Sequence, residues 1–390
     1  MQPKTSVKFD QKTFNNIKRT IKNMSVAGRA QLQDPTYAVD IPEDIGIKLN
    51  NGCNLRCKHC FEWNSDGYHH EMDKSVKNGE IDFTVFEQIM EQTREKKSRL
   101  YLWGGEPLFY SQFDQLAELL AKDPRETTIC TNAILIEQKL DAILKMSDQL
   151  TLLVSLEGFE QENDAIRGKG TFRRVVKAVE RLRDLQEKGI YKGRVSISLT
   201  INDAMIGKLY DFMVFFEEIG VDTVYFVFPW YIPEAVANTM DDFFMEQFPW
   251  LAKQISAQKY SWHSFTFHIS PAKVEPLIEE MERMNQRIWQ SRIRFQPALE
   301  PDEVRDFVLG VPKPAMKRTQ CLSIASRVDI MPDGKVNPCK FFPEFTLGDL
   351  TQKNVTEVFH SDNFKKHREV LGCGLMPICS RCVLLYNHGR

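Results

Sequence analysis

Nine cysteines are the residues of this 390-residue chain whose spacing most directly suggests chemistry. Cys53, Cys57 and Cys60 fall within one short segment, CNLRCKHC. Three thiolates on one loop can hold three irons of a [4Fe–4S] cube and leave the fourth iron open to a small chelating molecule. A structural zinc site instead needs four closed ligands, and His59 is an awkward fourth because it adjoins Cys60. Three incidental core cysteines are the remaining alternative.

A second group of cysteines lies near the end of the chain, at Cys321, Cys339, Cys373, Cys379 and Cys382. The first two flank a pair of apolar stretches that meet at an Asp-Gly pair, a hairpin turn signal. The last two have the spacing of a metal chelate. Taken alone, this region favours a zinc ribbon, which uses similar hairpin and knuckle spacings.

Composition limits the other classes of function. The 51 Lys and Arg nearly balance the 53 Asp and Glu, so nothing indicates nucleic acid or an anionic membrane as a partner. The first residues lack the apolar core of a signal peptide, and no apolar run is long enough for a membrane span. We therefore expect a soluble cytoplasmic protein, in which bunched cysteines more often hold metal than form disulfides.

The elements that must position these cysteines alternate in pattern. Apolar strand candidates are Ile45–Leu49, Arg99–Trp103, Thr127–Thr131, Leu150–Ser155, Val195–Thr200 and Thr223–Phe228. Amphipathic helical stretches between them are Phe83–Lys96, with Asp82 as its N-cap, and Gln112–Leu120, Leu135–Met146, Phe172–Lys188 and Lys208–Ile219. Repeated βα units predict a parallel sheet, in which ligands bind at the carboxyl ends of the strands. The first cysteine loop follows the first of these strands.

Three later strands are also followed by polar or glycine-rich segments. Gly104, Gly105, Glu106 and Pro107 follow the second, Thr131 and Asn132 end the third, and Ser155, Glu157 and Arg167 follow the fourth. Each has a structural alternative, namely a glycine-rich turn, a helix N-cap and a surface salt bridge. Cys130 is interpreted as a buried core thiol.

Together these motifs resemble the radical S-adenosylmethionine (SAM) superfamily, whose signature is a C-x3-C-x2-C loop after the first barrel strand. The resemblance implies that Cys53, Cys57 and Cys60 hold the SAM-binding cluster. It assigns SAM contacts to the family's GGEP, TN and S-L-D-G…R-G-x-G elements, which here are Gly104, Gly105, Glu106, Pro107, Thr131, Asn132, Ser155 and Arg167. His59, Ala133 and Glu157 depart from the usual residues of these motifs.

The C-terminal cysteines resemble a twitch or SPASM auxiliary-cluster domain. The resemblance implies one auxiliary [4Fe–4S] cluster, and thus two clusters in all, because five thiolates are too few for two auxiliary clusters. The implied ligands are Cys321, Cys339, Cys379 and Cys382. Cys373 stays unassigned, as a substitute ligand or a spare thiol.

The predicted fold is therefore α/β, a partial (β/α)6 radical SAM barrel with a small Cys-rich C-terminal domain. Residues 1–43 form an N-terminal extension and 44–228 the barrel. Residues 229–318 form a linker or cap insertion that includes a helix near Lys273–Ile288, and 319–390 form the auxiliary domain. Short helices are expected near Val355–His360 and Phe364–Val370.

The implied activity is reductive cleavage of SAM to a 5′-deoxyadenosyl radical, which abstracts a substrate hydrogen atom while the auxiliary cluster assists an oxidation. An electron donor such as flavodoxin or ferredoxin is implied as a partner. A peptide or protein substrate is favoured over a small molecule such as a sugar, aminocyclitol or nucleoside. A zinc-stabilised binding protein is the alternative that is not an enzyme. The sequence assigns no catalytic acid, base or hydrogen donor.

Overall fold

The computed structural model describes residues 3–8, 10–255 and 259–390 of the chain. Its centre is a parallel sheet whose strands pair in the order β2, β3, β4, β5, β6, β7 and β9. These strands are β2 (Asp44–Lys48), β3 (Arg99–Trp103), β4 (Thr127–Thr131), β5 (Leu150–Ser155), β6 (Arg194–Thr200), β7 (Thr223–Val227) and β9 (Arg292–Gln296). All six strands predicted from the sequence are present.

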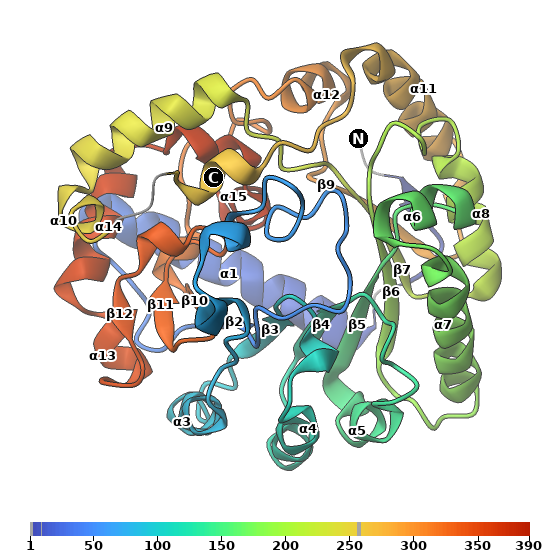
Figure 1. Cartoon of the computed structure of the whole chain (residues 1–390), viewed down its shortest axis with the longest axis horizontal. Helices are drawn as coiled ribbons and strands as arrows, with labels where there is room; N and C mark the ends of the chain where they lie inside the picture. Colours follow the sequence, from blue (N-terminus) through green and yellow to red (C-terminus); the bar gives the residue numbers. More distant parts are fainter. Residues whose placement is uncertain (1–2, 9, 256–258) are drawn as a thin grey trace.

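Helices cover the outer face of this curved sheet, as Figure 1 shows. They are α3 (Phe83–Gln92), α4 (Phe113–Lys122), α5 (Leu140–Lys145), α7 (Thr171–Glu187) and α8 (Leu209–Ile219). The shorter α2 (Lys74–Lys77) and α6 (Glu160–Arg167) lie in the connections that follow β2 and β5. In α4 the buried residues Phe113, Leu116, Ala117 and Leu120 recur at helical spacing, which places one apolar stripe against the sheet.

Two helices are shorter than predicted. The stretch Leu135–Met146 is helical only over α5, because residues 136–139 form turns. Helix α3 ends at Gln92, where the hydroxyl of Thr93 donates a 2.6 Å hydrogen bond to the Ile89 carbonyl. Its predicted N-cap is confirmed, since the Asp82 carboxylate accepts from the Thr84 amide at 2.8 Å.

Successive side chains of a strand point to opposite faces of the sheet, so one set packs in the core and the other faces the site. On β5, Leu150, Leu152 and Val154 are buried, whereas the side chains between them line a central cavity. Those lining residues are Thr151, Leu153 and Ser155. The sheet is thus sealed by helices on its outer face and faces a hollow on its inner face.

The interpretation of residues 229–318 as a linker or cap missed strand β9. This segment contains α9 (Glu234–Gln247), α10 (Pro249–Ala252), α11 (Val274–Asn285) and α12 (Pro301–Val308), and the short β8 (Ile288–Trp289). Strand β9 pairs in parallel with β7 and gives the sheet a seventh parallel β/α strand. Its sequence, RIRFQ, buries only Ile293 and Phe295, and its two arginines make the strand pattern weak.

The C-terminal hairpin extends the same sheet. The Asp-Gly turn joins β10 (Arg327–Ile330) to the antiparallel β11 (Lys335–Asn337), as predicted, and β12 (Gly348–Asp349) follows. Strand β10 pairs in parallel with β2, from Arg327 opposite Asp44 to Ile330 opposite Ile47. The C-terminal hairpin thus joins the sheet beside β2, the strand that precedes the first cysteine loop. Helices α13 (Val355–Phe359), α14 (Asp362–Cys373) and α15 (Val383–His388) complete this region.

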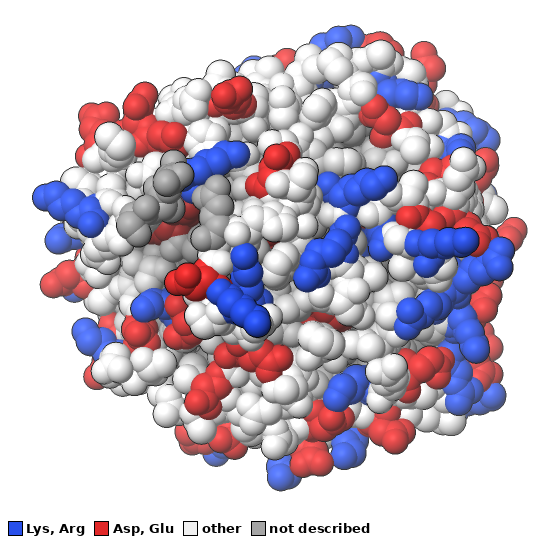
Figure 2. All heavy atoms as spheres, viewed as in Figure 1, with Lys and Arg blue, Asp and Glu red and all other residues white. Residues whose placement is uncertain are grey.

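The N-terminal extension contains a long helix, α1 (Gln11–Gln33), which crosses behind the strands in Figure 1. The preceding β1 (Lys4–Thr5) pairs with β8. Within the described ranges no helix is both long and apolar enough to cross a membrane. On the face shown in Figure 2, acidic and basic side chains are interspersed, in keeping with the formal net charge of −2.

Candidate functional site

The first cysteine loop lies at the carboxyl end of β2 and faces the central cavity. Cys53, Cys57 and Cys60 all line this cavity, which has a volume of about 560 Å³. The loop is held in place by backbone hydrogen bonds from Cys60 to the Cys57 carbonyl (3.1 Å) and from Lys58 to the Ile166 carbonyl of α6 (3.1 Å). Three thiols from one segment are thus presented to one space, as the motif predicts.

Burial makes these thiols hard to ionise by themselves. Loss of solvent raises the pKa of Cys53 and of Cys60 to about 12, and it also raises the pKa of Cys57. Metal ligation requires the thiolate, so a bound metal must displace the proton from each. Two donors already point at the sulfurs: Asn132 Nδ2 lies 3.9 Å from Cys53 Sγ, and Arg167 Nη1 lies 3.9 Å from Cys57 Sγ.

Backbone hydrogen bonds join the glycine-rich turn after β3 to the segment that leads into the cysteine loop. The Gly105 amide donates to the Asn50 carbonyl and the Glu106 amide to the Gly52 carbonyl, both at 2.9 Å. A Cβ on Gly105 would stand 2.2 Å from the Gly52 carbonyl oxygen, and one on Gly104 would stand 2.5 Å from Asn50 Oδ1. Both glycines are required by this close approach.

The Glu106 carboxylate binds the neighbouring loop. It accepts from the Thr131 hydroxyl at 2.6 Å, from the Asn132 amide at 2.7 Å and from the Leu108 amide at 3.1 Å. Burial raises its pKa although these donors favour the charged form. Pro107 begins a single 3-10 turn beside it. The GGEP and TN elements therefore form one connected unit around the cysteine loop.

A buried ion-pair cluster lies at the end of β5. The Glu157 carboxylate, 1 % exposed, pairs with Arg167 Nη2 at 2.5 Å and lies 2.7 Å from His59 Nε2. The His59 contact is an ion-pair contact rather than a well-aligned hydrogen bond, since its Nε2 has no hydrogen-bond partner. Burial opposes ionisation of Glu157, but the positive charges of His59 and Arg167 outweigh it and lower the pKa. His59 and Glu157, both departures from the family motif, are thus partners.

Ser155 ends β5 with its side chain toward the cavity, and Cys130 on β4 lies beside it. The Cys130 sulfur is 4.0 Å from Ser155 Oγ. Cys130 lines the cavity and is partly exposed. The interpretation of Cys130 as a buried core thiol was therefore wrong, because the alternation of β4 turns this residue inward.

The C-terminal thiols form a second group. Cys339 is partly exposed, and its pKa is raised well above the usual range by loss of solvent and by the nearby charges of Cys379, Cys382 and Cys321. Cys373 is exposed at the end of α14. In the described parts of the chain no three His, Cys, Asp or Glu side chains converge closely enough to hold a single metal ion. A four-iron cube spaces its thiolates more widely than one zinc with bonds of about 2.3 Å.

Sequence reasoning missed several residues that line the cavity. Lys340 follows Cys339 and packs against the rings of Tyr101, Trp103 and Phe341. Burial lowers the pKa of Lys340 to about 8. Arg327 of β10 also lines the cavity and pairs with Asp329 at 2.7 Å. The position of Lys340 next to Cys339 was the one signal available in the sequence, and only the fold shows that this lysine reaches the cavity.

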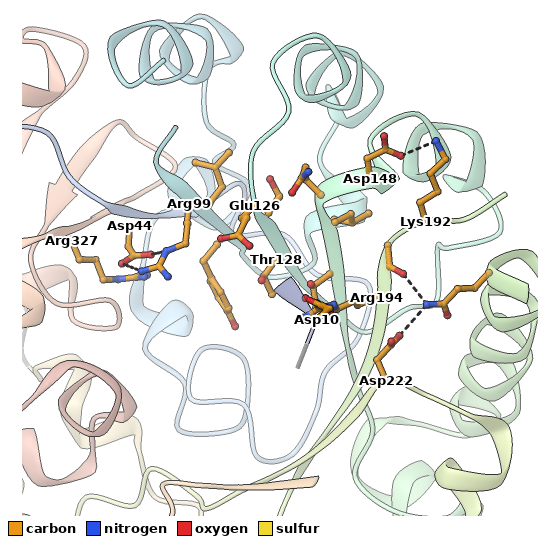
Figure 3. A pocket seen from close by; sticks show the side chains of 18 of the residues that line it. Asp10, Asp44, Arg99, Glu126, Thr128, Asp148, Lys192, Arg194, Asp222 and Arg327 are labelled. Atoms are coloured by element: carbon orange, nitrogen blue, oxygen red, sulfur yellow. Dashed lines mark hydrogen bonds and ion pairs between the residues drawn. The ribbon is translucent and has the colours of Figure 1, made fainter. Parts of the chain in front are cut away.

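A second cavity, also about 560 Å³, lies at the amino ends of the strands (Figure 3). Some of its charged residues pair with one another: Arg99 with Asp44 at 2.7 Å, and Lys192 with Asp148 at 3.3 Å. This cavity shares five lining residues with the central cavity, namely Tyr101, Thr128, Thr151, Arg327 and His388.

The residues that line the central cavity fit an iron–sulfur cluster and SAM. The donor set is three thiols, and the adjoining glycine cradle has no room for a Cβ. Arg167 Nε is buried without a hydrogen-bond partner, so this guanidinium keeps donor capacity for a carboxylate.

Comparison with known proteins agrees with this geometry. Residues 47–213 match the model of the radical SAM superfamily, and residues 321–383 match SPASM, an iron–sulfur cluster-binding domain. Mycofactocin maturase MftC of Mycolicibacterium smegmatis is 29% identical over 42% of this chain and 39% of its own length. Fe-coproporphyrin III synthase of Methanosarcina barkeri is 27% identical over 45% of this chain and 42% of its own length. The match therefore spans less than half the length of either relative.

A solved structure shares the fold across both cysteine groups. Streptococcus suis SuiB bound to the precursor peptide SuiA aligns with a TM-score of 0.59 and 15% identity, over 93% of this chain and 73% of SuiB. The family matches cover both motif regions, and the families and curated relatives are enzymes, so the alternative of a zinc-stabilised binding protein is set aside. The chain thus contains a radical SAM domain over residues 47–213 and a SPASM iron–sulfur cluster-binding domain over residues 321–383.

Proposed function

We propose that this enzyme modifies a peptide by SAM-dependent radical chemistry, using two [4Fe–4S] clusters. When bound at a cluster on Cys53, Cys57 and Cys60, SAM supplies on one-electron reduction a 5′-deoxyadenosyl radical that removes a substrate hydrogen atom. The observation that carries the proposal is the central cavity. The three thiols line it on one side, and Lys340, Phe341 and Val383, next to two of the C-terminal cysteines, line it on another.

The chain's own residues hold and orient these groups. Arg167 is suited to the SAM carboxylate, with Glu157 fixing its guanidinium by a buried ion pair. The backbone at Gly104 and Gly105 offers close approach to the SAM amino group, and Glu106 fixes that backbone to Thr131 and Asn132. Ser155 adds a hydroxyl on the cavity wall.

Cys321, Cys339, Cys379 and Cys382 are the proposed ligands of the auxiliary cluster. Their mutual charge interactions support a common site. A cluster there would accept an electron from the substrate radical, which would make the net reaction oxidative. Flavodoxin or ferredoxin is the proposed electron donor to the enzyme.

A peptide substrate is supported by the fold shared with SuiB, which was solved with a precursor peptide, and by the aromatic cavity wall. Phe61 stacks on Phe265 with ring centroids 4.5 Å apart, and Trp230 packs edge-on against Phe341 at 3.7 Å. Such rings provide apolar area for side chains of a bound segment. A small molecule is the second candidate, favoured by the similarity to Fe-coproporphyrin III synthase.

Anaerobic reconstitution tests the radical chemistry. We expect about eight iron and eight sulfide per chain for two cubes, and 5′-deoxyadenosine when dithionite and SAM are added. Replacing Cys53, Cys57 and Cys60 together by Ala should remove half of the iron and abolish 5′-deoxyadenosine formation. Cys373→Ala is the matched control and should change neither quantity. 5′-Deoxyadenosine formation by the triple variant would refute the site assignment.

The substrate class is tested by deuterium transfer. Reduced enzyme with SAM is given either deuterated candidate precursor peptides or deuterated coproporphyrin, and 5′-deoxyadenosine is analysed by mass spectrometry. Label from the peptide alone supports peptide modification. Label from the porphyrin alone would replace it with the second candidate.

A further inference from the structure

The central cavity is lined by Lys340, whose ammonium group has no counter-ion among the residues that the structure describes. Three carboxylates line the cavity, and each is already engaged by the protein. Glu106 accepts three hydrogen bonds, Glu157 pairs with Arg167, and Glu62 lies 2.5 Å from Lys48 Nζ. None of the three is within ion-pair distance of Lys340 among the described contacts.

The remaining cations of the cavity wall are paired. Arg167 is held by Glu157 and Arg327 by Asp329. Lys340 Nζ has neither an ion pair nor a hydrogen bond to any of the described residues; it lies 3.9 Å from the ring centroid of Tyr101, 4.7 Å from that of Phe341 and 5.1 Å from that of Trp103. Aromatic faces attract an ammonium group but leave its hydrogen-bond donors unused.

The surroundings of Lys340 contain a further unused donor. Trp103, which is 7 % exposed, lines the same cavity, and its indole Nε1 has no hydrogen-bond partner. The buried indole N–H is costly unless a ligand uses it, and the half-buried ammonium beside it has no acceptor among the described residues. A carboxylate is the group that satisfies an ammonium most strongly while fitting beside aromatic rings.

We propose that Lys340 binds a carboxylate of the substrate and so fixes the substrate in the cavity between the two cysteine groups. This inference rests on the proposed function and narrows its substrate class to peptides that bring either an acidic side chain or a free C-terminal carboxylate to the site. The lysine follows Cys339 directly, so any substrate group bound to it lies next to the proposed auxiliary-cluster ligand.

A different role for Lys340 would be to balance the negative charge of a cluster on Cys339. The two roles differ in what a neutral substitution changes. Loss of a substrate anchor changes the preference for charged over neutral peptides. Loss of a cluster counter-charge changes the reduction potential of that cluster and leaves peptide preference as it was.

The test uses the anaerobically reconstituted holoenzyme with SAM, immobilised, and three random hexapeptide libraries with acetylated N-termini. The first has a central Glu and an amidated C-terminus, the second a central Gln and an amidated C-terminus, and the third a central Gln and a free C-terminus. The retained fraction of each library is measured by mass spectrometry. Comparing the first and third libraries with the second separates a side-chain carboxylate from a terminal one.

We expect wild type to retain one of the charged libraries about tenfold more than the neutral library, the size of one charge-assisted hydrogen bond. Lys340→Met should abolish this difference and Lys340→Arg should restore most of it. Lys335→Met, at an exposed lysine on β11, is the matched control and should keep the wild-type preference.

Two results would overturn the inference. One is equal retention of all three libraries by wild type. The other is that Lys340→Met keeps the wild-type preference for a charged library. If a redox titration of that variant then shows a shifted midpoint potential for the auxiliary cluster, Lys340 acts on the cluster instead. A wild-type enzyme that forms no 5′-deoxyadenosine with dithionite and SAM would instead overturn the proposed function, which the retention assay does not measure.

Discussion

Gly105→Ala tests whether the close approach of two loops positions the cysteine site. The added Cβ would stand 2.2 Å from the Gly52 carbonyl oxygen and 2.5 Å from that of Asn51. Contact between non-bonded heavy atoms is favourable only near 3.5–4.0 Å, so one loop must move by roughly 1 Å. Both obstructing atoms are backbone, so no side chain can rotate aside to relieve the contact.

The expected magnitude follows from the bonds that this movement breaks. The amides of Gly105 and Glu106 donate two buried hydrogen bonds to the cysteine loop, each worth about 1 kcal/mol net. Overpacking adds about 1–3 kcal/mol, so the free energy of unfolding should fall by roughly 3–5 kcal/mol. A displacement of about 1 Å at a reactive site costs about 10²-fold in rate, so 5′-deoxyadenosine formation should fall by that order.

Urea unfolding and the rate of 5′-deoxyadenosine formation measure the two effects. Gly374→Ala is the matched control, because a Cβ at that position meets no atom within 4 Å and its φ of 161° is extended backbone. If Gly105→Ala unfolds at the same urea concentration as wild type and cleaves SAM at the same rate, the close approach of the two loops does not position the cysteine site.

Three further predictions concern other parts of the molecule. Cys339→Ala should lower the iron content from about eight to about four per chain while Cys373→Ala leaves it unchanged, as measured by iron assay; equal losses would refute the ligand assignment. Glu43 has its pKa lowered from 4.5, because the ion pairs with Lys96 and Arg19 outweigh the effect of burial. The unfolded state therefore binds more protons between the two pKa values, and this stabilisation is present above pH 4.5 and lost as pH falls through the lowered pKa. Glu43→Gln should be less stable than wild type at pH 7, with the difference vanishing in acid; a difference independent of pH in urea titrations would contradict this. Arg99→Met leaves Asp44 at the barrel base without its bidentate partner and should cost about 3 kcal/mol in thermal or urea unfolding, whereas Lys192→Met, which breaks an exposed pair, should cost under about 1 kcal/mol.

Local patterns were sufficient for much of the barrel. Strands β3, β4 and β5 begin and end at the predicted residues, because each is a short segment rich in aliphatic, aromatic or β-branched residues. Strand β9 could not be found in this way, since RIRFQ carries two arginines and its strand conformation depends on pairing with β7. At such an edge position, pairing with the neighbouring strand outweighs the intrinsic strand propensity of the residues.

For the site, the sequence by itself determined the chemistry of the ligands. The spacing of Cys53, Cys57 and Cys60 after an apolar strand favoured a metal centre over incidental core cysteines, and the later strand-end motifs indicated a cofactor beside it. These inferences hold because covalent spacing places neighbouring side chains on one loop whatever the rest of the chain does.

Tertiary structure alone decided which distant residues meet. The parallel pairing of β10 with β2 adds the C-terminal hairpin to the barrel sheet, and the alternation of β4 turns Cys130 into the cavity. Tertiary structure also decided that Glu157 pairs with His59 and Arg167, and that Lys340 lies in the same cavity without an ion pair to any described residue. Such contacts depend on strand order and register across hundreds of residues, and a local sequence pattern does not specify either.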